Sequence, residues 1–166
     1  MKPLASASAT TAWVIVANKP LYPLYVWWLV GEHVPTSLWT LAAWPLFLGV
    51  ALSASSWPLA ARIALPLAGI ADTGFSDFMF GAGSGVEAFF VPCAALAALS
   101  FQSHEVWVSR ALTATVFVAF AGARYLSVPG LQPWPDAEAS TLLNLNLYSA
   151  ASLTAFVGLR FAAARG

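Results

Sequence analysis

The segment ADTGFSDFMFGAGSGVEAFFVPC, residues 71–93, contains three carboxylates and four glycines between two long apolar runs. Charged residues are scarce elsewhere in the chain, so three acids around one glycine-rich turn need a physical reason. We interpret residues 81–85 as the turn between two antiparallel helices. We expect Asp72, Asp77 and Glu87 to lie at the mouth of the helix bundle that contains this turn.

The composition indicates that most of the protein surface does not face water. Of the 166 residues, 60% are hydrophobic and only 8% are charged, and the mean hydropathy is +0.75. A soluble domain would carry about a quarter charged residues, so a lipid bilayer is the predicted surroundings. The net charge is zero and basic runs are lacking, which argues against a nucleic-acid partner.

Apolar segments of sufficient length recur along the whole chain. A helix needs about 20 mainly apolar residues to cross the hydrocarbon core of a bilayer. Six segments meet this need, at residues 12–30, 37–54, 58–80, 85–101, 106–126 and 139–160. We therefore predict an all-α polytopic membrane protein, an antiparallel bundle of six transmembrane helices that forms a single domain over residues 1–166. Residues 1–11 are interpreted as a short N-terminal tail.

The basic residues indicate the orientation, because Lys and Arg of short loops are retained on the cytoplasmic side. With both termini in the cytoplasm, only Arg124 falls on the outer side. The basic residues that fall inside are Lys2, Arg62, Arg110, Arg160 and Arg165. We expect an integral protein of the cytoplasmic membrane with both termini cytoplasmic.

Asp72 and Lys19 are charges inside predicted spans. An acid in a span costs about 2.5 to 3.5 kcal/mol on insertion scales, so it needs compensation. Asp72 is either a ligand contact or proton carrier that faces the bundle interior, or a residue near the outer interface that is hydrogen-bonded to Thr73, Ser76 or a neighbouring helix. Lys19 must reach the interface or pair. Asp77 and Glu87 either contribute to a ligand site or are simply solvated.

Polar side chains also interrupt the first and last segments. Pro20 and Pro23 bend the first helix and free backbone carbonyls, beside which Asn18, Tyr22 and Tyr25 could line a cavity. In the last segment Asn144, Asn146 and Ser149 are candidates for ligand contact, with hydrogen bonding between helices as the alternative. The candidate ligand-binding residues are Asp72, Asp77, Glu87, Tyr22, Tyr25, Asn144, Asn146 and Ser149.

Signs of catalysis and of cofactor binding are lacking. His33 and His104 fall on opposite sides of the predicted bundle, so they do not form a metal or haem site. A nucleophile and base that could act together are not recognisable on one face. We predict no catalytic residues, no metal and no cofactor, and hence a protein that is not an enzyme.

The layout and three short patterns resemble a known membrane domain. The patterns are Asn18 followed by PLYPLY at residues 20–25, FGAGSGVEAFF at residues 80–90 and LNLNLYSAASL at residues 143–153. Together they are similar to the six-helix membrane domain of bacterial quorum-sensing histidine kinases and class III adenylate cyclases. The resemblance implies a receptor for a small, fairly apolar signal in the bacterial inner membrane, often as a dimer. After Arg160 this chain reads only FAAARG, so we expect no catalytic output domain.

Three functions remain open at this point. The first is a non-enzymatic, sensor-like module that binds a small, fairly apolar ligand and acts through a signalling partner or a homodimer. The second is a small proton-coupled transporter that uses Asp72. The third is an accessory or structural subunit of a larger membrane complex.

Overall fold

The fold is all-α, as predicted from the sequence. The computed structural model describes residues 3–31, 34–81, 83–126, 130–131 and 134–165. Helical residues make up 89% of the structure, and the described part of the chain contains no strand. In chain order the elements are α1 (Pro3–Asn18), η1 (Lys19–Leu21), α2 (Tyr22–Leu29), α3 (Val34–Leu38), η2 (Trp39–Ala43), α4 (Trp44–Ser53), α5 (Pro58–Phe80), η3 (Val86–Phe89), α6 (Phe90–Leu99), η4 (Ser103–Glu105), α7 (Val106–Leu126) and α8 (Asp136–Arg165), where η denotes a 3-10 helix.

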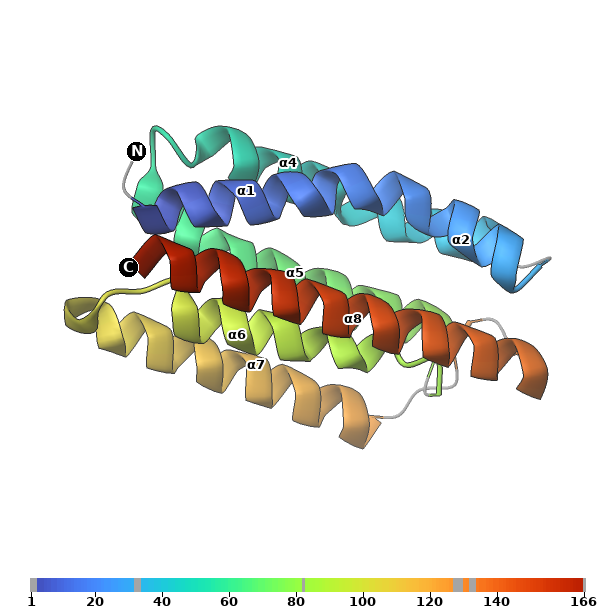
Figure 1. Ribbon diagram of the computed structural model, residues 1–166. Coiled ribbons are helices and arrows are strands. Elements are labelled where there is room, and N and C mark those ends of the chain that lie inside the picture. Colours follow the sequence, from blue (N-terminus) through green and yellow to red (C-terminus); the bar gives the residue numbers. More distant parts are fainter. Residues whose placement is uncertain (1–2, 32–33, 82, 127–129, 132–133, 166) are drawn as a thin grey trace.

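These elements run lengthwise along one elongated bundle (Figure 1). Over the described residues they make up six passes, namely α1–α2, α3–α4, α5, η3–α6, α7 and α8. The central pass is α5, which packs against α1, α4, α6 and α7. Figure 1 shows both chain ends at the same end of the bundle. We call this the terminal end, and the end that holds Phe80 the distal end.

Among the described residues, three helices are long and apolar enough to cross a membrane: Pro35–Ser53, Ser103–Leu126 and Asp136–Arg165. The remaining predicted spans each have a feature that sets them apart. The first is interrupted by η1, α5 carries Arg62, Asp72 and Asp77, and α6 has only 10 α-helical residues after η3. The membrane character of the chain is therefore supported, whereas six crossings remain a prediction.

The predicted N-terminal tail at residues 1–11 is wrong from residue 3 onward. Helix α1 begins at Pro3, and Ala5, Ala7, Ser8 and Thr11 are fully buried. Leu4 is the single large apolar side chain among residues 3–11, but the small residues around it let helices approach closely. The hydroxyls of Ser8 and Thr11 donate to carbonyl oxygens one turn back, at 3.1 and 2.9 Å. They can therefore be buried without an unsatisfied polar group.

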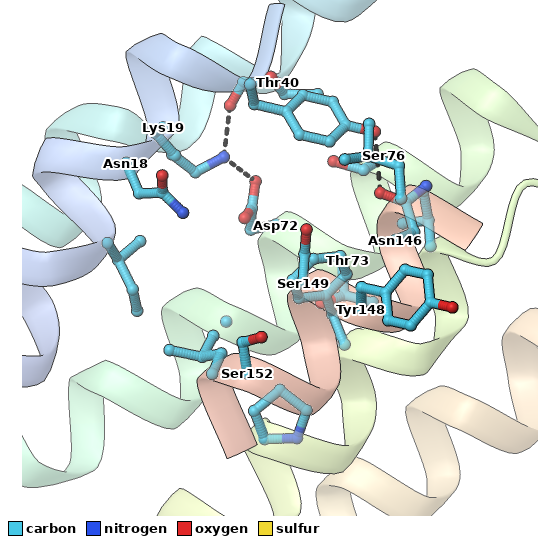
Figure 2. A pocket seen from close by; sticks show the side chains of 18 of the residues that line it. Asn18, Lys19, Thr40, Asp72, Thr73, Ser76, Asn146, Tyr148, Ser149 and Ser152 are labelled. Atoms are coloured by element: carbon cyan, nitrogen blue, oxygen red, sulfur yellow. Dashed lines mark hydrogen bonds and ion pairs between the residues drawn. The ribbon is translucent and has the colours of Figure 1, made fainter. Parts of the chain in front are cut away.

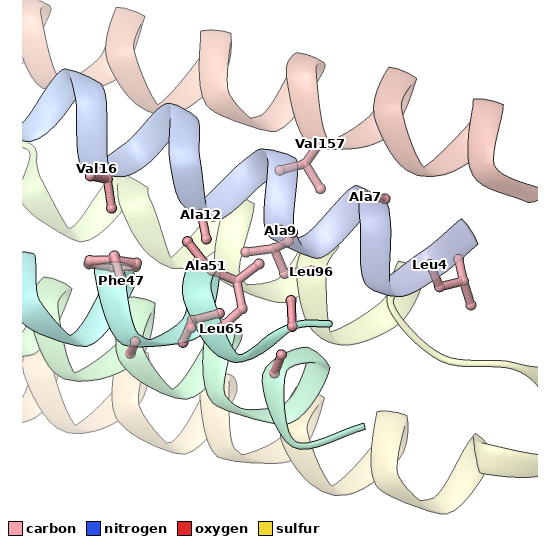
Figure 3. Packing of buried hydrophobic residues seen from close by; sticks show 14 of the residues in the cluster. Leu4, Ala7, Ala9, Ala12, Val16, Phe47, Ala51, Leu65, Leu96 and Val157 are labelled. Atoms are coloured by element: carbon pink, nitrogen blue, oxygen red, sulfur yellow. The ribbon is translucent and has the colours of Figure 1, made fainter. Parts of the chain in front are cut away.

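The small residues of α1 pack into the main apolar core (Figure 3). This cluster joins Leu4, Ala7, Ala9, Ala12 and Val16 of α1 to Phe47, Leu65, Leu96 and Val157 of four other helices. The N-terminal helix is thus part of the bundle and holds α4 and α8 together.

The terminal end of the bundle is fixed by two arginines. The Arg62 guanidinium of α5 donates to both carboxylate oxygens of Glu105, at 2.6 and 2.7 Å, and to the Ser100 carbonyl oxygen at 3.0 Å. Arg165 donates to the Leu99 carbonyl oxygen at 2.9 Å. The sequence analysis placed Arg62 at the cytoplasmic side but did not predict that it pairs with Glu105.

Overpacking tests whether residues 3–11 belong to the core. We expect Ala7→Leu to destabilise the protein by about 1 to 3 kcal/mol, because the fully buried site has no room for the added atoms. Ala17→Leu, at an exposed position of the same helix, should change stability by less than about 0.5 kcal/mol. Unfolding of the purified protein in mixed micelles measures both changes. Equal stability of the two variants would restore the interpretation of this segment as a tail.

Candidate functional site

One cavity of about 760 Å³ lies inside the bundle and receives side chains from every pass except α7. Its walls include apolar side chains such as Phe47, Leu65, Phe89, Leu96 and Phe156. The polar residues that line it are Asn18, Lys19, Tyr22, Tyr25, Thr40, Asp72, Thr73, Ser76, Cys93, Thr141, Asn144, Asn146, Tyr148, Ser149 and Ser152. Six of the eight predicted ligand-binding residues are among them.

The main polar feature of the cavity is an ion pair between Lys19 and Asp72 (Figure 2). Lys19 Nζ lies 2.7 Å from Asp72 Oδ1, and the two side chains are only 11% and 20% exposed. Lys19 also donates to the Thr40 carbonyl oxygen at 2.6 Å, and its ammonium lies 5.8 Å from the Phe47 ring centroid. The two charges inside predicted spans therefore compensate each other. For Lys19 this is the predicted pairing, and for Asp72 it is a hydrogen bond to a neighbouring pass.

Two breaks in α-helical structure create this arrangement. Lys19 lies in η1, where Pro20 has no backbone N–H to continue an α-helix. Thr40 lies in η2, a second 3-10 segment, which packs against η1. The backbone of one break thus accepts a hydrogen bond from the side chain of the other, while α5 supplies the carboxylate. Burying two charges is costly, and both the pairing and this additional hydrogen bond offset that cost.

Asn146 connects three segments at the distal side of the cavity. Tyr22 donates its hydroxyl hydrogen to Asn146 Oδ1 at 3.0 Å, and Asn146 Nδ2 donates to the Ser84 carbonyl oxygen at 2.9 Å. The Asn146 side chain is fully buried. It therefore makes the hydrogen bonds between helices that were the alternative to ligand contact, although it also lines the cavity.

Aromatic side chains close the distal end of the cavity. Phe80 stacks on Trp134 with ring centroids 5.7 Å apart and meets Tyr22 edge to face at 6.2 Å. The Trp134 indole N–H donates to the Phe80 carbonyl oxygen at 3.1 Å. Gly130 packs directly on this backbone, since a Cβ at that position would lie 2.5 Å from the Phe80 carbonyl atoms. The segment before α8 is thereby held over the end of α5.

The three acids of the central segment do not gather at one mouth. Asp72 lines the cavity, whereas Asp77 and Glu87 do not. Five residues along an α-helix correspond to a rotation of about 140°, so Asp72 and Asp77 project from different sides of α5. Glu87 instead pairs with Arg124 of α7, at 3.6 Å. Asp77 and Glu87 do lie close enough to interact with each other and with Arg124, but Asp72 is separate from them. The expectation of one mouth shared by all three acids is therefore wrong.

Other residues of the site were not among the candidates. Ser152 lies on the face of α8 that also carries Tyr148, and Thr73 and Ser76 lie on the same side of α5 as Asp72. Lys19 is the most informative omission. A lysine and an aspartate in two apolar segments each require a partner, and that requirement was sufficient to suggest that they pair.

Asp77, Glu87 and His104 belong to no cluster of metal ligands among the described residues. Over the described residues there is no group of three or more metal-ligating side chains. Residue His33 lies outside the described residues, so its predicted separation from His104 is not tested. The site of the described chain with the chemistry to hold a molecule is the cavity beside Lys19 and Asp72.

A double-mutant cycle measures the coupling of Lys19 and Asp72. We expect Lys19→Met or Asp72→Asn alone to cost about 3 kcal/mol, because each leaves one buried charge without its partner. The double variant should be more stable than either single variant. Unfolding in mixed micelles gives all three free energies, and strictly additive losses would show that the pair is not coupled. Arg124→Gln serves as the control. Arg124 is 62% exposed and lies 3.6 Å from Glu87, so this pair contributes less than about 1 kcal/mol.

Comparisons with known proteins do not identify a relative of this chain. No family model, no curated protein and no solved structure matches it. The candidate site is therefore defined by its own geometry and chemistry.

Proposed function

We propose that the chain spans the cytoplasmic membrane six times, with both termini in the cytoplasm. Three helices have the required length and apolar character, and the exterior carries large apolar side chains on several passes. Examples are Trp28 of α2, Trp107 and Val118 of α7, and Leu159 of α8, all more than 70% exposed. Lipid is the solvent that accommodates such a surface. The common end of the two termini fits an even number of crossings (Figure 1).

Reporter fusions test this topology. We expect phosphatase inserted at Gly83 to be active, because this turn lies at the distal end, and a fluorescent protein inserted at Ser56 to fluoresce, because that turn lies at the terminal end. The basic residues favour a cytoplasmic terminal end. Swapping the two reporters provides the control. Cytoplasmic signals from both positions would contradict the proposed orientation and the six crossings.

Within this topology we propose a non-enzymatic, sensor-like module that binds a small, fairly apolar ligand. The cavity of about 760 Å³ carries this proposal. Ligand sites in proteins typically enclose about 300 to 1,000 Å³, with mainly apolar walls and a few polar groups that fix orientation. The walls here follow that pattern, with Lys19 and Asp72 as the charged groups.

The ion pair favours an uncharged polar group on the ligand. The charges of Lys19 and Asp72 cancel, so a charged ligand would enter a site without a net opposite charge and would lose its hydration. An uncharged group with a donor and an acceptor can bond to both residues. Asp72 Oδ2 accepts no hydrogen bond from the described residues, and Lys19 uses two of its three N–H groups on Asp72 and Thr40. Both retain capacity for a ligand.

Helix α8 connects the cavity to the terminal end. It has 30 residues, contributes Ser149 and Phe156 to the cavity wall, and is attached through Arg165 to the end of α6. A ligand that contacts α8 in one arrangement of the bundle more strongly than in another shifts the population toward that arrangement. A partner protein at the terminal end, or a second copy, would receive this change.

A proton-coupled transporter that uses Asp72 is the second candidate. The ion pair lies at two broken helical segments, and discontinuous helices form the substrate and ion sites of many transporters. An accessory subunit is the third candidate, in which the ion pair has a structural role only. The three functions differ in what they require from the Asp72 carboxylate.

Binding of N-phenyl-1-naphthylamine, an uncharged apolar fluorophore, tests the sensor proposal in nanodiscs after subtraction of the empty-disc signal. We expect saturable binding that Ser149→Phe weakens at least about tenfold, or 1.4 kcal/mol, because the larger side chain fills the cavity. Leu159→Phe, on the exterior of the same helix, should have no effect. Asp72→Asn should weaken binding in a sensor, abolish flux in a transporter, and change neither in an accessory subunit. Non-saturable binding by the unmodified protein would contradict the proposal.

A further inference from the structure

We infer that the ligand enters the cavity sideways from the bilayer, through a slot between α1–α2 and α8, and that it is a single-chain amphiphile dissolved in the membrane. This inference rests on the proposed ligand-binding function and adds the route and the chemical class of the ligand. The slot is defined by Val14, Tyr25 and Leu29 on one side and by Asn144, Tyr148 and Ser152 on the other.

Side chains that line the cavity are also exposed on the outside of the bundle along this slot. On the α1–α2 side, Val14, Tyr25 and Leu29 line the cavity and are 38%, 38% and 46% exposed. On the α8 side, Tyr148 lines the cavity and is 74% exposed. The cavity is open to the outside rather than fully enclosed, and these exposed lining side chains mark two edges of its opening. The cavity therefore opens between these two passes.

The two ends of the bundle offer no comparable opening in the described structure. At the distal end, the stacked rings of Phe80 and Trp134 and the hydrogen bonds of Asn146 lie across the cavity. Toward the terminal end, Leu65, Leu96 and Val157 belong to the packed core, in which each is at most 2% exposed (Figure 3). A ligand arriving from water along the bundle axis would have to displace one of these layers. A ligand arriving from lipid would not.

The α8 side of the slot is polar although it faces the exterior. Asn144, Tyr148 and Ser152 are spaced four residues apart, so they form one stripe along α8, and all three are exposed. Polar groups at membrane depth usually face a bundle interior or a cavity rather than lipid. The opposite side of the slot carries the apolar Val14 and Leu29 and, between them in sequence, the polar Tyr25. Polar and apolar groups therefore both border the slot, which matches a molecule with an uncharged polar end and an apolar chain.

The polar stripe formed by Asn144, Tyr148 and Ser152 extends along α8 from the distal end toward the level of the Lys19–Asp72 ion pair. Asn144 lies beside the level at which Leu143 meets Gly85, near the distal end, and Ser152 is two turns further along α8. Figure 2 shows Tyr148, Ser149 and Ser152 on the α8 wall across from Asp72 and Lys19. The polar end of an amphiphile can thus move along hydrogen-bonding groups from the distal leaflet to the charged pair.

Cys93 provides a reporter, because it is the only cysteine of the chain and lies on the cavity wall, 4% exposed. The full chain in nanodiscs is treated with N-dodecylmaleimide, which dissolves in lipid, or with a sulfonated maleimide, which stays in water. Either reagent forms a bond between its ring carbon and the Cys93 sulfur, detected as a mass increase of the intact protein. We expect the alkyl reagent to label at least tenfold faster than the sulfonated one.

Bulk placed in the slot should block this labelling. We expect Ser152→Trp to slow the reaction of N-dodecylmaleimide at least tenfold, because the indole occupies the opening. Leu147→Trp, which adds a similar ring at an exposed position of α8 outside the cavity wall, should change the rate less than twofold. Circular dichroism of both variants establishes that they are equally folded.

Four results would overturn the inference. They are equal labelling by the two reagents, labelling only after denaturation, no effect of Ser152→Trp, and rapid copper-phenanthroline crosslinking of Tyr148→Cys in a Cys93→Ser background into a dimer. The last result would show that a second copy covers the slot. Each of them leaves the saturable binding of N-phenyl-1-naphthylamine as a separate measurement. If N-phenyl-1-naphthylamine does not bind saturably but Cys93 is still labelled faster by the alkyl reagent, the proposed ligand-binding function is wrong, whereas the lateral route into the cavity stands.

Discussion

The contact on which the structure depends is the pairing of Lys19 with Asp72 inside an otherwise apolar bundle. Neither charge is stable alone in such surroundings, because the loss of hydration costs several kcal/mol per ion. Together they fix the position of the first pass against α5, at the point where the first pass ceases to be α-helical. The broken segments η1 and η2 bring the two charges together, and the cavity with its polar side chains lies around this contact.

The two helix breaks, η1 and η2, stabilise each other, because one supplies a hydrogen-bond donor and the other a free carbonyl. Backbone carbonyls that leave α-helical hydrogen bonding need another donor at membrane depth, and the ammonium of Lys19 supplies one for Thr40. A lysine is suited to this task because its three N–H groups point in different directions. One residue thereby satisfies a carboxylate and a carbonyl and still borders the open space. The irregular backbone exposes carbonyl groups that make the site polar. The Lys19 ammonium donates a hydrogen bond to one of them, the Thr40 carbonyl, so this group can be buried at membrane depth.

The sequence predicted the all-α class and the bounds of two passes closely. Residues 58–80 and 106–126 coincide with α5 and α7 because prolines and polar residues mark their ends.

The prediction failed where the signal depends on side-chain size or on partners far along the chain. Residues 3–11 contain only one large apolar side chain, Leu4, too few to identify a span, yet Ala7 and Thr11 are buried because they are small. The pairing of Arg62 with Glu105 links residues 43 positions apart, which no local pattern encodes. Six candidate residues line one cavity because helical spacing preserves the face of a residue, whereas Asp77 and Glu87 were grouped with Asp72 by their proximity in sequence alone.

Helix α5 is fastened at two depths, and this has a mechanical consequence. Arg62 ties it to Glu105 at the terminal end, and Asp72 ties it to Lys19 at about 15 Å further along the axis, as ten residues of α-helix require. A helix held by ion pairs at two points along its axis cannot tilt independently of its neighbours, so α5 is expected to stay in place when the bundle rearranges. Beyond Lys19 the first pass carries prolines at the joint, and a movement of this portion must release the Tyr22–Asn146 hydrogen bond and the packing of the buried Val26. Rearrangement of the bundle is therefore expected as a swing of α2 about that joint, with α5 as the stationary reference.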